Sequence, residues 1–182
     1  MLWEAQFLQS LQAIRSPFLD KAMEILSMLG DHGLFCICLG LILLIFSKTR
    51  STGIKVLLSM ALAYIVANLI IKNVVGRVRP FEAYPYLEAL IKKPHGSSFP
   101  SGHTVNVFAA ATAIFLDNKK WGTFALIIAA LVAFSRLYNC VHYPTDVLAG
   151  VAIGVIFAVL VHYFVFPACE RGVKRLRSRK EK

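Results

Sequence analysis

Five apolar runs, separated by short polar stretches, constrain the fold of this chain more than any other feature of the sequence. They occupy residues 33–46, 54–71, 104–116, 121–134 and 147–166. Hydrophobic residues make up 57% of the chain and charged residues 16%, whereas soluble domains are about 25% charged. A helix needs about 20 residues to cross a bilayer, so we expect the shorter runs to continue as helix through the polar residues at their ends. The sequence therefore predicts an all-α, polytopic membrane bundle of about five transmembrane helices.

The first 30 residues have a different character from the apolar runs. Between Leu2 and Arg15, apolar residues recur at helical spacing among polar ones, which predicts an amphipathic helix too polar to cross a membrane. Ser16 and Pro17 are typical of an N-cap and a first helical position, and Gly30 of a helix end. We expect a single domain over 1–182, with N-terminal interfacial helices (1–30), the transmembrane bundle (33–166) and a basic tail (167–182).

Basic residues gather in that tail and in two of the turns between the apolar runs. The turns contain Lys48, Arg50, Lys55, Lys119 and Lys120. Because successive spans alternate between the two sides, both turns and the tail fall on one side, which the positive-inside rule makes cytoplasmic. The same rule explains much of the net charge of +10. We see no basic stripe with interleaved aromatic residues and expect no nucleic-acid partner.

Three polar islands fall on the opposite, outer side of this predicted membrane protein. The first is Lys72 with Arg79-Pro80, and the second is Pro100-Ser101-Gly102-His103 at the start of the third run. The third contains Ser135, Arg136, His142 and Asp146. Basic residues on the outer side need a local reason, and an anionic substrate would supply one.

The first two islands each allow an ordinary explanation and a chemical one. Lys72 and Arg79 either reach along the interface to water or bind an anion. Ser101 is placed to cap a helix, whose free N–H groups and the adjacent Gly102 would suit a phosphate. A capped helix start needs nothing more, but His103 adds little to a cap and is able to act as an acid.

His142 and Asp146 form the most suggestive pair in the third island. Tyr143-Pro144 between them disfavours a continuous helix, so we expect a turn with Asp146 near the start of the fifth helix. There the carboxylate would hold one imidazole nitrogen and leave the other as a nucleophile. A histidine held only for structural reasons fits these two residues equally well.

Taken together, the three islands resemble the signature of the type 2 phosphatidic acid phosphatase superfamily, which includes lipid phosphatases and vanadium haloperoxidases. That signature is Lys, six residues, Arg-Pro; then Pro-Ser-Gly-His; then Ser-Arg, five residues, His, three residues, Asp. The chain matches every part of it, from Lys72 to Asp146, and the resemblance extends over 33–166, the expected catalytic part. One departure is Cys140, where many members carry glycine.

The resemblance implies catalytic roles for His142, His103 and Asp146. His142 would attack phosphorus to form a phosphohistidine, Asp146 would orient His142, and His103 would protonate the leaving oxygen. The phosphate would be held by Lys72, Arg79, Ser101, Gly102, Ser135 and Arg136. Positive charge around the transferred phosphoryl group is what this chemistry needs most. Because no carboxylate cluster suited to magnesium is apparent, we expect no metal or other cofactor.

The resulting expectation is a membrane lipid phosphatase that acts on a phosphomonoester or diphosphate at the outer face of the cell membrane. Undecaprenyl diphosphate is the favoured substrate, and a phosphatidylglycerophosphate- or phosphatidate-type lipid is the rival. Arg77, Lys92 and Lys93 lie outside the signature and are candidates for a second phosphate or headgroup contact, or else ordinary loop charges. The alternatives are a non-catalytic protein that binds or transports an anionic lipid, and a vanadate-type haloperoxidase. The sequence leaves the oligomeric state open.

Overall fold

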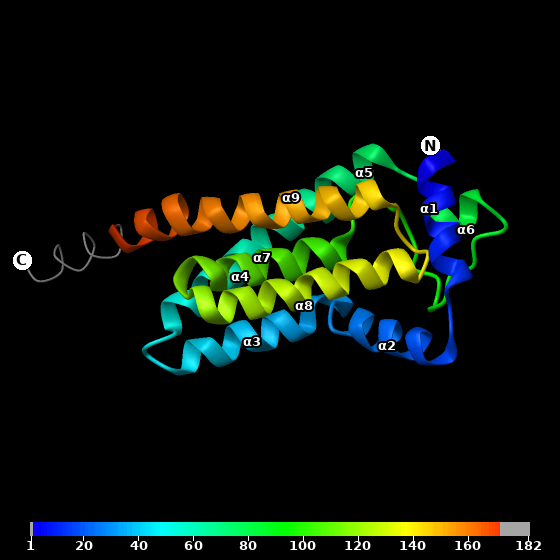
Figure 1. The fold of residues 1–182 in the computed structure, drawn as a ribbon. Coiled ribbons are helices and arrows are strands. Elements are labelled where there is room, and N and C mark those ends of the chain that lie inside the picture. Colours follow the sequence, from blue (N-terminus) through cyan, green and yellow to red (C-terminus); the bar gives the residue numbers. More distant parts are fainter. Residues whose placement is uncertain (1, 172–182) are drawn as a thin grey trace, which may run out of the picture.

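A computed structural model describes residues 2–171 as a bundle of helices with no strand in that range (Figure 1). The chain begins with α1 (Leu2–Ala13), α2 (Pro17–Met28), a 3₁₀ turn η1 (Asp31–Gly33) and α3 (Leu34–Ile45). There follow α4 (Arg50–Tyr64), the π-helical segment η2 (Ile65–Ile71), α5 (Lys72–Val75) and α6 (Pro80–Ala83). The last elements are α7 (Gly102–Asp117), α8 (Lys119–Tyr138), α9 (Pro144–Leu160) and the π-helical segment η3 (Val161–Val165).

Four helical stretches of the described chain are long and apolar enough to cross a membrane. They are Pro17–Ile45, Arg50–Ala83, Lys119–Tyr138 and Pro144–Arg171. The prediction of an all-α membrane bundle is confirmed, although its count of about five spans is not exact. The first stretch is also interrupted, because His32 and Gly33 have positive φ angles of 52° and 68° between α2 and α3.

The third predicted span, α7, has only 16 residues and does not reach the length of the other four. It contacts α3, α4, α8 and α9, so protein surrounds it. Nine of its residues are buried, and most of the apolar ones are alanine or valine, which let the neighbouring helices approach closely. A helix shielded from lipid in this way does not itself need the full thickness of a bilayer.

The helix boundaries near the N-terminus follow the predicted capping signals. The Ser16 hydroxyl accepts a hydrogen bond from the backbone N–H of Leu19, and Pro17 is the first residue of α2. The helix ends at Met28, two residues before Gly30. In Figure 1, α2 runs in the same general direction as α3, whereas α1 crosses one end of the bundle. The interfacial position expected for residues 1–30 stays a prediction.

The two ends of the bundle differ in content (Figure 1). The α3–α4 turn, the α7–α8 turn and the last described residues, which follow η3, lie at one end. Helices α1 and α6 lie at the other end. The three polar islands occur where α5, α7, α8 and α9 begin or end near this second end. Most of the predicted basic tail, residues 172–182, lies outside the described residues.

Candidate active site

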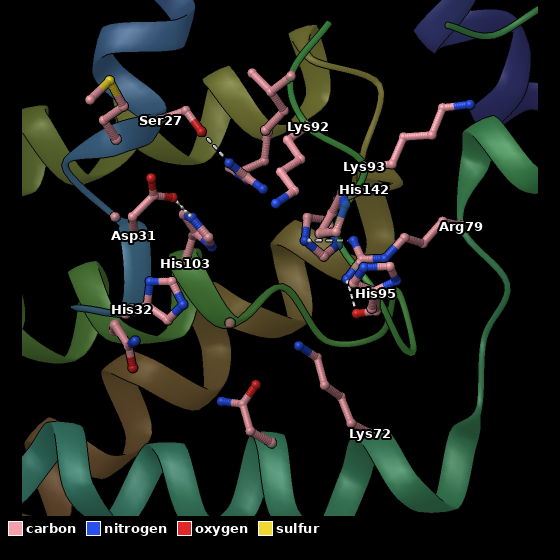
Figure 2. A pocket seen from close by; sticks show the side chains of 18 of the residues that line it. Ser27, Asp31, His32, Lys72, Arg79, Lys92, Lys93, His95, His103 and His142 are labelled. Atoms are coloured by element: carbon pink, nitrogen blue, oxygen red, sulfur yellow. Dashed lines mark hydrogen bonds and ion pairs between the residues drawn. The ribbon is translucent and has the colours of Figure 1, made fainter. Parts of the chain in front are cut away.

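The three polar islands meet at a cavity of about 600 Å³ near the end of the bundle covered by α1 (Figure 2). Residues of the three islands that line it are Lys72, Arg79, Gly102, His103, Arg136 and His142. Segments as far apart as residues 72 and 142 thus contribute to one hollow. The cations, both histidines and the start of α7 face a common space, as the resemblance implies.

The first island is placed by the continuation of α4 through the π-helical segment into α5. Lys72 is the first residue of α5 and lies near the start of α7, because a Cβ added to Gly102 would be 3.6 Å from Lys72 Nζ. Arg79 is only 3% exposed. Its Nη1 donates to the carbonyl oxygen of Val141 at 2.9 Å and lies 3.5 Å from Nε2 of His142. The guanidinium is therefore fixed beside one face of the cavity.

In the second island, Gly102 and His103 line the cavity but the Ser101 side chain does not. Ser101 occupies the N-cap position of α7 without the expected side-chain cap, because its hydroxyl accepts from Thr104 Oγ1 at 3.0 Å. A Cβ at Gly102 would approach Asn68 Oδ1 to 2.9 Å, so this close contact favours glycine. His103 Nε2 lies 2.7 Å from Oδ1 of Asp31.

In the third island, Arg136 reaches the cavity and Ser135 does not. Arg136 is 2% exposed and donates to the Ser27 hydroxyl on α2. The Ser135 hydroxyl instead donates to the carbonyl oxygen of Val132, one turn back in α8, at 2.7 Å. The phosphate contacts expected of the Ser101 and Ser135 side chains are therefore not supported by their geometry.

The turn before α9 has the form predicted from the sequence, whereas the contact of His142 with Asp146 is longer than the hydrogen bond expected there. Pro144 is the first residue of that helix, and Asp146 accepts from the backbone N–H of Tyr143 at 2.9 Å. His142 Nδ1 lies 3.5 Å from Asp146 Oδ2, longer than the roughly 2.7–3.2 Å of an ordinary hydrogen bond. Its Nε2 is on the Arg79 side of the ring, which leaves that nitrogen toward the cavity (Figure 2).

The charge state of His142 suits a nucleophile. Burial lowers the pKa of His142 from 6.5 to about 3, and Arg136 and Arg79 act in the same direction against the opposing effect of Asp146. The imidazole is therefore neutral near pH 7, and its unprotonated nitrogen carries a lone pair.

The three candidate headgroup contacts outside the signature differ in where they lie. Lys92 and Lys93 line the cavity. Lys92 extends toward it in Figure 2, whereas Lys93 turns away and its Nζ lies 5.6 Å from the centre of the Phe81 ring. Arg77 does not line the cavity. Its guanidinium contacts Glu4 at 2.6 Å and Asp146 at 2.5 Å, so the expected headgroup contact of Arg77 is not supported.

Sequence reasoning missed several polar residues that line the cavity. Asn68 stands four residues before Lys72 and Asn106 three residues after His103, so helical spacing contained a signal for both. Asp31 carried no such signal, because it reaches His103 through the turn between α2 and α3. Within residues 2–171, no group of three or more His, Cys, Asp or Glu side chains is arranged to hold a metal ion.

Comparison with known proteins identifies the family. The PAP2 superfamily profile matches residues 52–169. This chain belongs to the PAP2 superfamily. It is a multi-pass membrane protein and, by class, a membrane lipid phosphatase, in agreement with the resemblance inferred from the sequence.

Three relatives illustrate the range of the superfamily around this chain. The undecaprenyl-diphosphatase of Sulfolobus acidocaldarius is 40% identical over 114 residues, which cover 62% of this chain and 55% of that protein. Phosphatidylglycerophosphatase B of Bacillus subtilis is 29% identical over 180 residues, covering 91% and 82%. The crystal structure of Aquifex aeolicus LpxE matches with a TM-score of 0.79 at 26% identity, covering 89% of this chain and 96% of that one.

Proposed function

We propose that this protein removes the terminal phosphate of a prenyl diphosphate, undecaprenyl diphosphate, through a phosphohistidine on His142. We place the reaction at the outer face of the cell membrane, with the C-terminus in the cytoplasm. The observation that carries the proposal is the position of the buried imidazole of His142, whose Nε2 faces a cavity lined by Lys72, Arg79 and Arg136. Residues 33–166 would form the catalytic part of a single domain.

In the first step, His142 Nε2 attacks the terminal phosphorus. An N–P bond forms as the bond from phosphorus to the bridging oxygen breaks, and His103 donates a proton to the departing lipid monophosphate. Lys72, Arg79 and Arg136 would stabilise charge on the non-bridging oxygens, with the Gly102 backbone at the start of α7 beside them. The contact of Asp146 with His142 Nδ1 would hold the ring in the attacking orientation.

In the second step, water replaces the histidine on phosphorus. His103, now neutral, accepts a proton from the water as its oxygen bonds to phosphorus and the N–P bond breaks. Inorganic phosphate leaves, and both histidines return to their starting states. The 2.7 Å contact between Asp31 and His103 Nε2 supports a fixed position of this ring during both proton transfers.

Two features of the cavity support a diphosphate with a lipid tail. Lys92 lines the cavity in addition to the three cations proposed to hold the transferred phosphate. A second phosphate would give Lys92 a partner. Met28 on α2 and Tyr64 on α4 line the same cavity, yet both side chains are more than 40% exposed. A lipid tail would therefore have a route from the cavity toward the bilayer between two membrane-spanning stretches.

Three alternatives make different predictions. A phosphatidylglycerophosphate-type lipid remains the rival substrate, because one relative named above is a phosphatidylglycerophosphatase. Binding or transport of an anionic lipid would need the cations but no nucleophile, and His142 then has no role. A vanadate-type haloperoxidase would depend on added vanadate and peroxide, and the four membrane-spanning stretches favour a lipid substrate instead.

His142→Ala is expected to abolish phosphate release from undecaprenyl diphosphate, because this variant has no imidazole nitrogen to accept the phosphoryl group. His103→Ala should slow turnover by about 10²–10⁴-fold, the usual effect of a lost general acid, while still forming phosphoenzyme. Labelled substrate, rapid quenching and peptide mapping would locate the label on His142. His95→Ala removes another histidine that lines the same cavity and should retain most activity. Full activity in His142→Ala would rule out the mechanism.

Lys92→Ala is expected to lower kcat/KM for the diphosphate by roughly tenfold or more, because a charge-assisted hydrogen bond contributes about 1.5–3 kcal/mol. Its activity on phosphatidic acid should change little. The matched control is Lys93→Ala. It removes the same charge at the next residue, whose side chain turns away from the cavity and lies near Phe81. Equal losses in both variants on both substrates would indicate general attraction of anionic lipid. A wild-type enzyme that cleaves only monophosphates would exclude the diphosphate.

A further inference from the structure

The N-terminal helix α1 buries a carboxylate against the start of α9. Glu4 is fully buried, although α1 lies at the surface of one end of the bundle. A buried carboxylate is costly unless charged or hydrogen-bonding groups satisfy it. Glu4 also precedes the PAP2 match at residues 52–169, so the superfamily profile does not account for it.

Both carboxylate oxygens of Glu4 have partners next to the active site. Oε1 accepts from the backbone N–H of Thr145 at 3.2 Å and from its hydroxyl at 2.7 Å. Oε2 lies 2.6 Å from Nη2 of Arg77. The carboxylate therefore joins α1 to the residue before Asp146 and to the cation beside it.

Arg77 extends this network to Asp146 itself. Its Nη1 donates to Asp146 Oδ1 at 2.5 Å and to the Thr145 hydroxyl at 2.7 Å. The guanidinium also lies 3.9 Å from the centre of the Tyr143 ring, a distance at which cation–π attraction is strong. Arg77 is thus held from three sides and has little freedom to move away from the carboxylate.

The two oxygens of Asp146 are consequently divided between two tasks. Arg77 contacts Oδ1, whereas Oδ2 accepts from the Ser98 hydroxyl and the Tyr143 backbone N–H and faces His142 Nδ1. A carboxylate that is fixed at both oxygens can hold the imidazole in one orientation. The rotation of Asp146 that would release His142 would also break its contact with Arg77.

We propose that Glu4 and Arg77 form a positioning pair that holds Asp146, and through it His142, in the orientation for attack on phosphorus. This inference rests on the proposed phosphatase mechanism. It also gives Arg77 a role that the sequence did not suggest, in place of contact with the lipid headgroup. Helix α1 then serves catalysis through a single buried side chain at its beginning.

The charges of the pair make its effect measurable. Arg77 offsets the charge of Asp146, and that charge favours the protonated form of His142, so Arg77→Gln should move the acidic limb of the kcat/KM profile to higher pH. Glu4→Gln removes an anion and should not move the acidic limb of this profile to higher pH. Both variants leave unchanged the other charged or titratable groups that contact His142 or line its cavity, which are Glu24, Asp31, His32, Tyr64, Lys72, Arg79, Lys92, Lys93, His95, His103, Arg136, Tyr143 and Asp146.

The experiment is a double-mutant cycle on the full-length protein in detergent with undecaprenyl diphosphate as substrate. Glu4→Gln and Arg77→Gln should each lower kcat by about 10–100-fold, as loss of the partner that orients a metal-binding side chain does, with KM within about twofold. Because Glu4 and Arg77 contact each other and support the same carboxylate, the loss in the double variant should be clearly smaller than the product of the two single losses. Glu4→Asp should recover part of the loss.

The control is Gln12→Ala, at the other end of α1. Gln12 donates to the carbonyl oxygen of Tyr86 and accepts from the Glu88 backbone N–H, so it helps α1 to dock without touching Arg77. It should lower the unfolding temperature but leave kcat and the pH profile unchanged.

Two patterns of results separate this inference from the proposed function. If Gln12→Ala and Glu4→Gln lose activity in parallel, or if the cycle is additive and Arg77→Gln keeps the wild-type pH profile, α1 is only a structural cover and the positioning pair is wrong. If the wild type releases no phosphate or His142→Ala remains active, the proposed function itself fails.

Discussion

Cys140 shows how a single residue keeps a turn that its side chain does not favour. Its φ angle is 54°, in the left-handed region where non-glycine residues cost about 1–2 kcal/mol. Glycine, which the resemblance leads one to expect here, adopts this conformation without that cost. Cys140 is fully buried and packs with Ala5 and Leu8 of α1, so its side chain adds a contact that glycine lacks. The departure was visible in the sequence, but its effect on α1 was not.

Side-chain direction marks the limit of what the motif residues alone predict. The spacing of His142, Pro144 and Asp146 was enough to predict a turn into α9, because proline fixes where the helix begins. By contrast, Arg77 and Arg79 are two residues apart in a segment without regular structure. With no period to relate their directions, only the family signature indicated that Arg79 would face the cavity, and nothing in the sequence indicated that Arg77 would contact Asp146.

The buried imidazole of His142 also predicts how stability depends on pH. The pKa of His142 is about 6.5 in an unfolded chain and about 3 in the folded protein, mainly because of burial. Between these values the unfolded chain binds a proton that the folded protein does not, so stability falls as the pH falls through this window. Above about pH 6.5 the imidazole is neutral in both the folded and the unfolded protein, so this loss of stability is absent.

His142→Asn should therefore lose less unfolding temperature than the wild type when the pH is lowered from about 7 to about 5. Thermal unfolding of both proteins in the same detergent would measure the difference. The comparison cancels the carboxylates and other histidines that titrate in the same range, because both proteins contain them. An identical drop in the two proteins would show that His142 is not kept neutral by the fold.

At the scale of elements, α7 joins the site to the rest of the bundle by close contact with α9. Gly150 and Gly154 are four residues apart and face α7, where an added Cβ would meet backbone or side-chain atoms of residues 101–109 within about 3 Å. Small residues at this spacing let membrane helices approach closely. The sequence predicted both helices from their apolar runs, but it did not indicate which helix would be central.

Gly154→Ala should destabilise the protein, because the new methyl group would lie 2.8 Å from Ala109 N and Val105 O. Helix backbone yields little, so we expect a cost of about 1–3 kcal/mol, typical of an overpacked core, and a lower unfolding temperature in detergent. Ala152→Val adds bulk to an exposed position of the same helix and serves as the control. A Gly154→Ala protein as stable as wild type would mean that α7 and α9 are less tightly packed than described.

At the scale of the whole molecule, two groups of basic residues lie at opposite ends of the bundle. The cations of the cavity lie near the end covered by α1, where an anionic lipid would give them a partner. Lys48 and Lys120 are exposed in the turns at the opposite end and line no part of that cavity. The alternation of spans and turns was predictable from hydropathy. The closing of the site by the first 33 residues was not, because contacts such as Glu4 with Arg77 join distant segments.

The same separation predicts how the protein lies in the membrane. Turns rich in lysine and arginine are retained in the cytoplasm, so the end with Lys48 and Lys120 should face inward and the cavity outward. In a variant without native cysteines, Glu88→Cys on the exposed loop near the site should react with a membrane-impermeant thiol reagent in intact bacterial cells. Lys120→Cys, also at an exposed position, in the first turn of α8, should react only after the cells are permeabilised. Labelling of Lys120→Cys in intact cells, with Glu88→Cys protected, would reverse the orientation and place the phosphatase site on the cytoplasmic face.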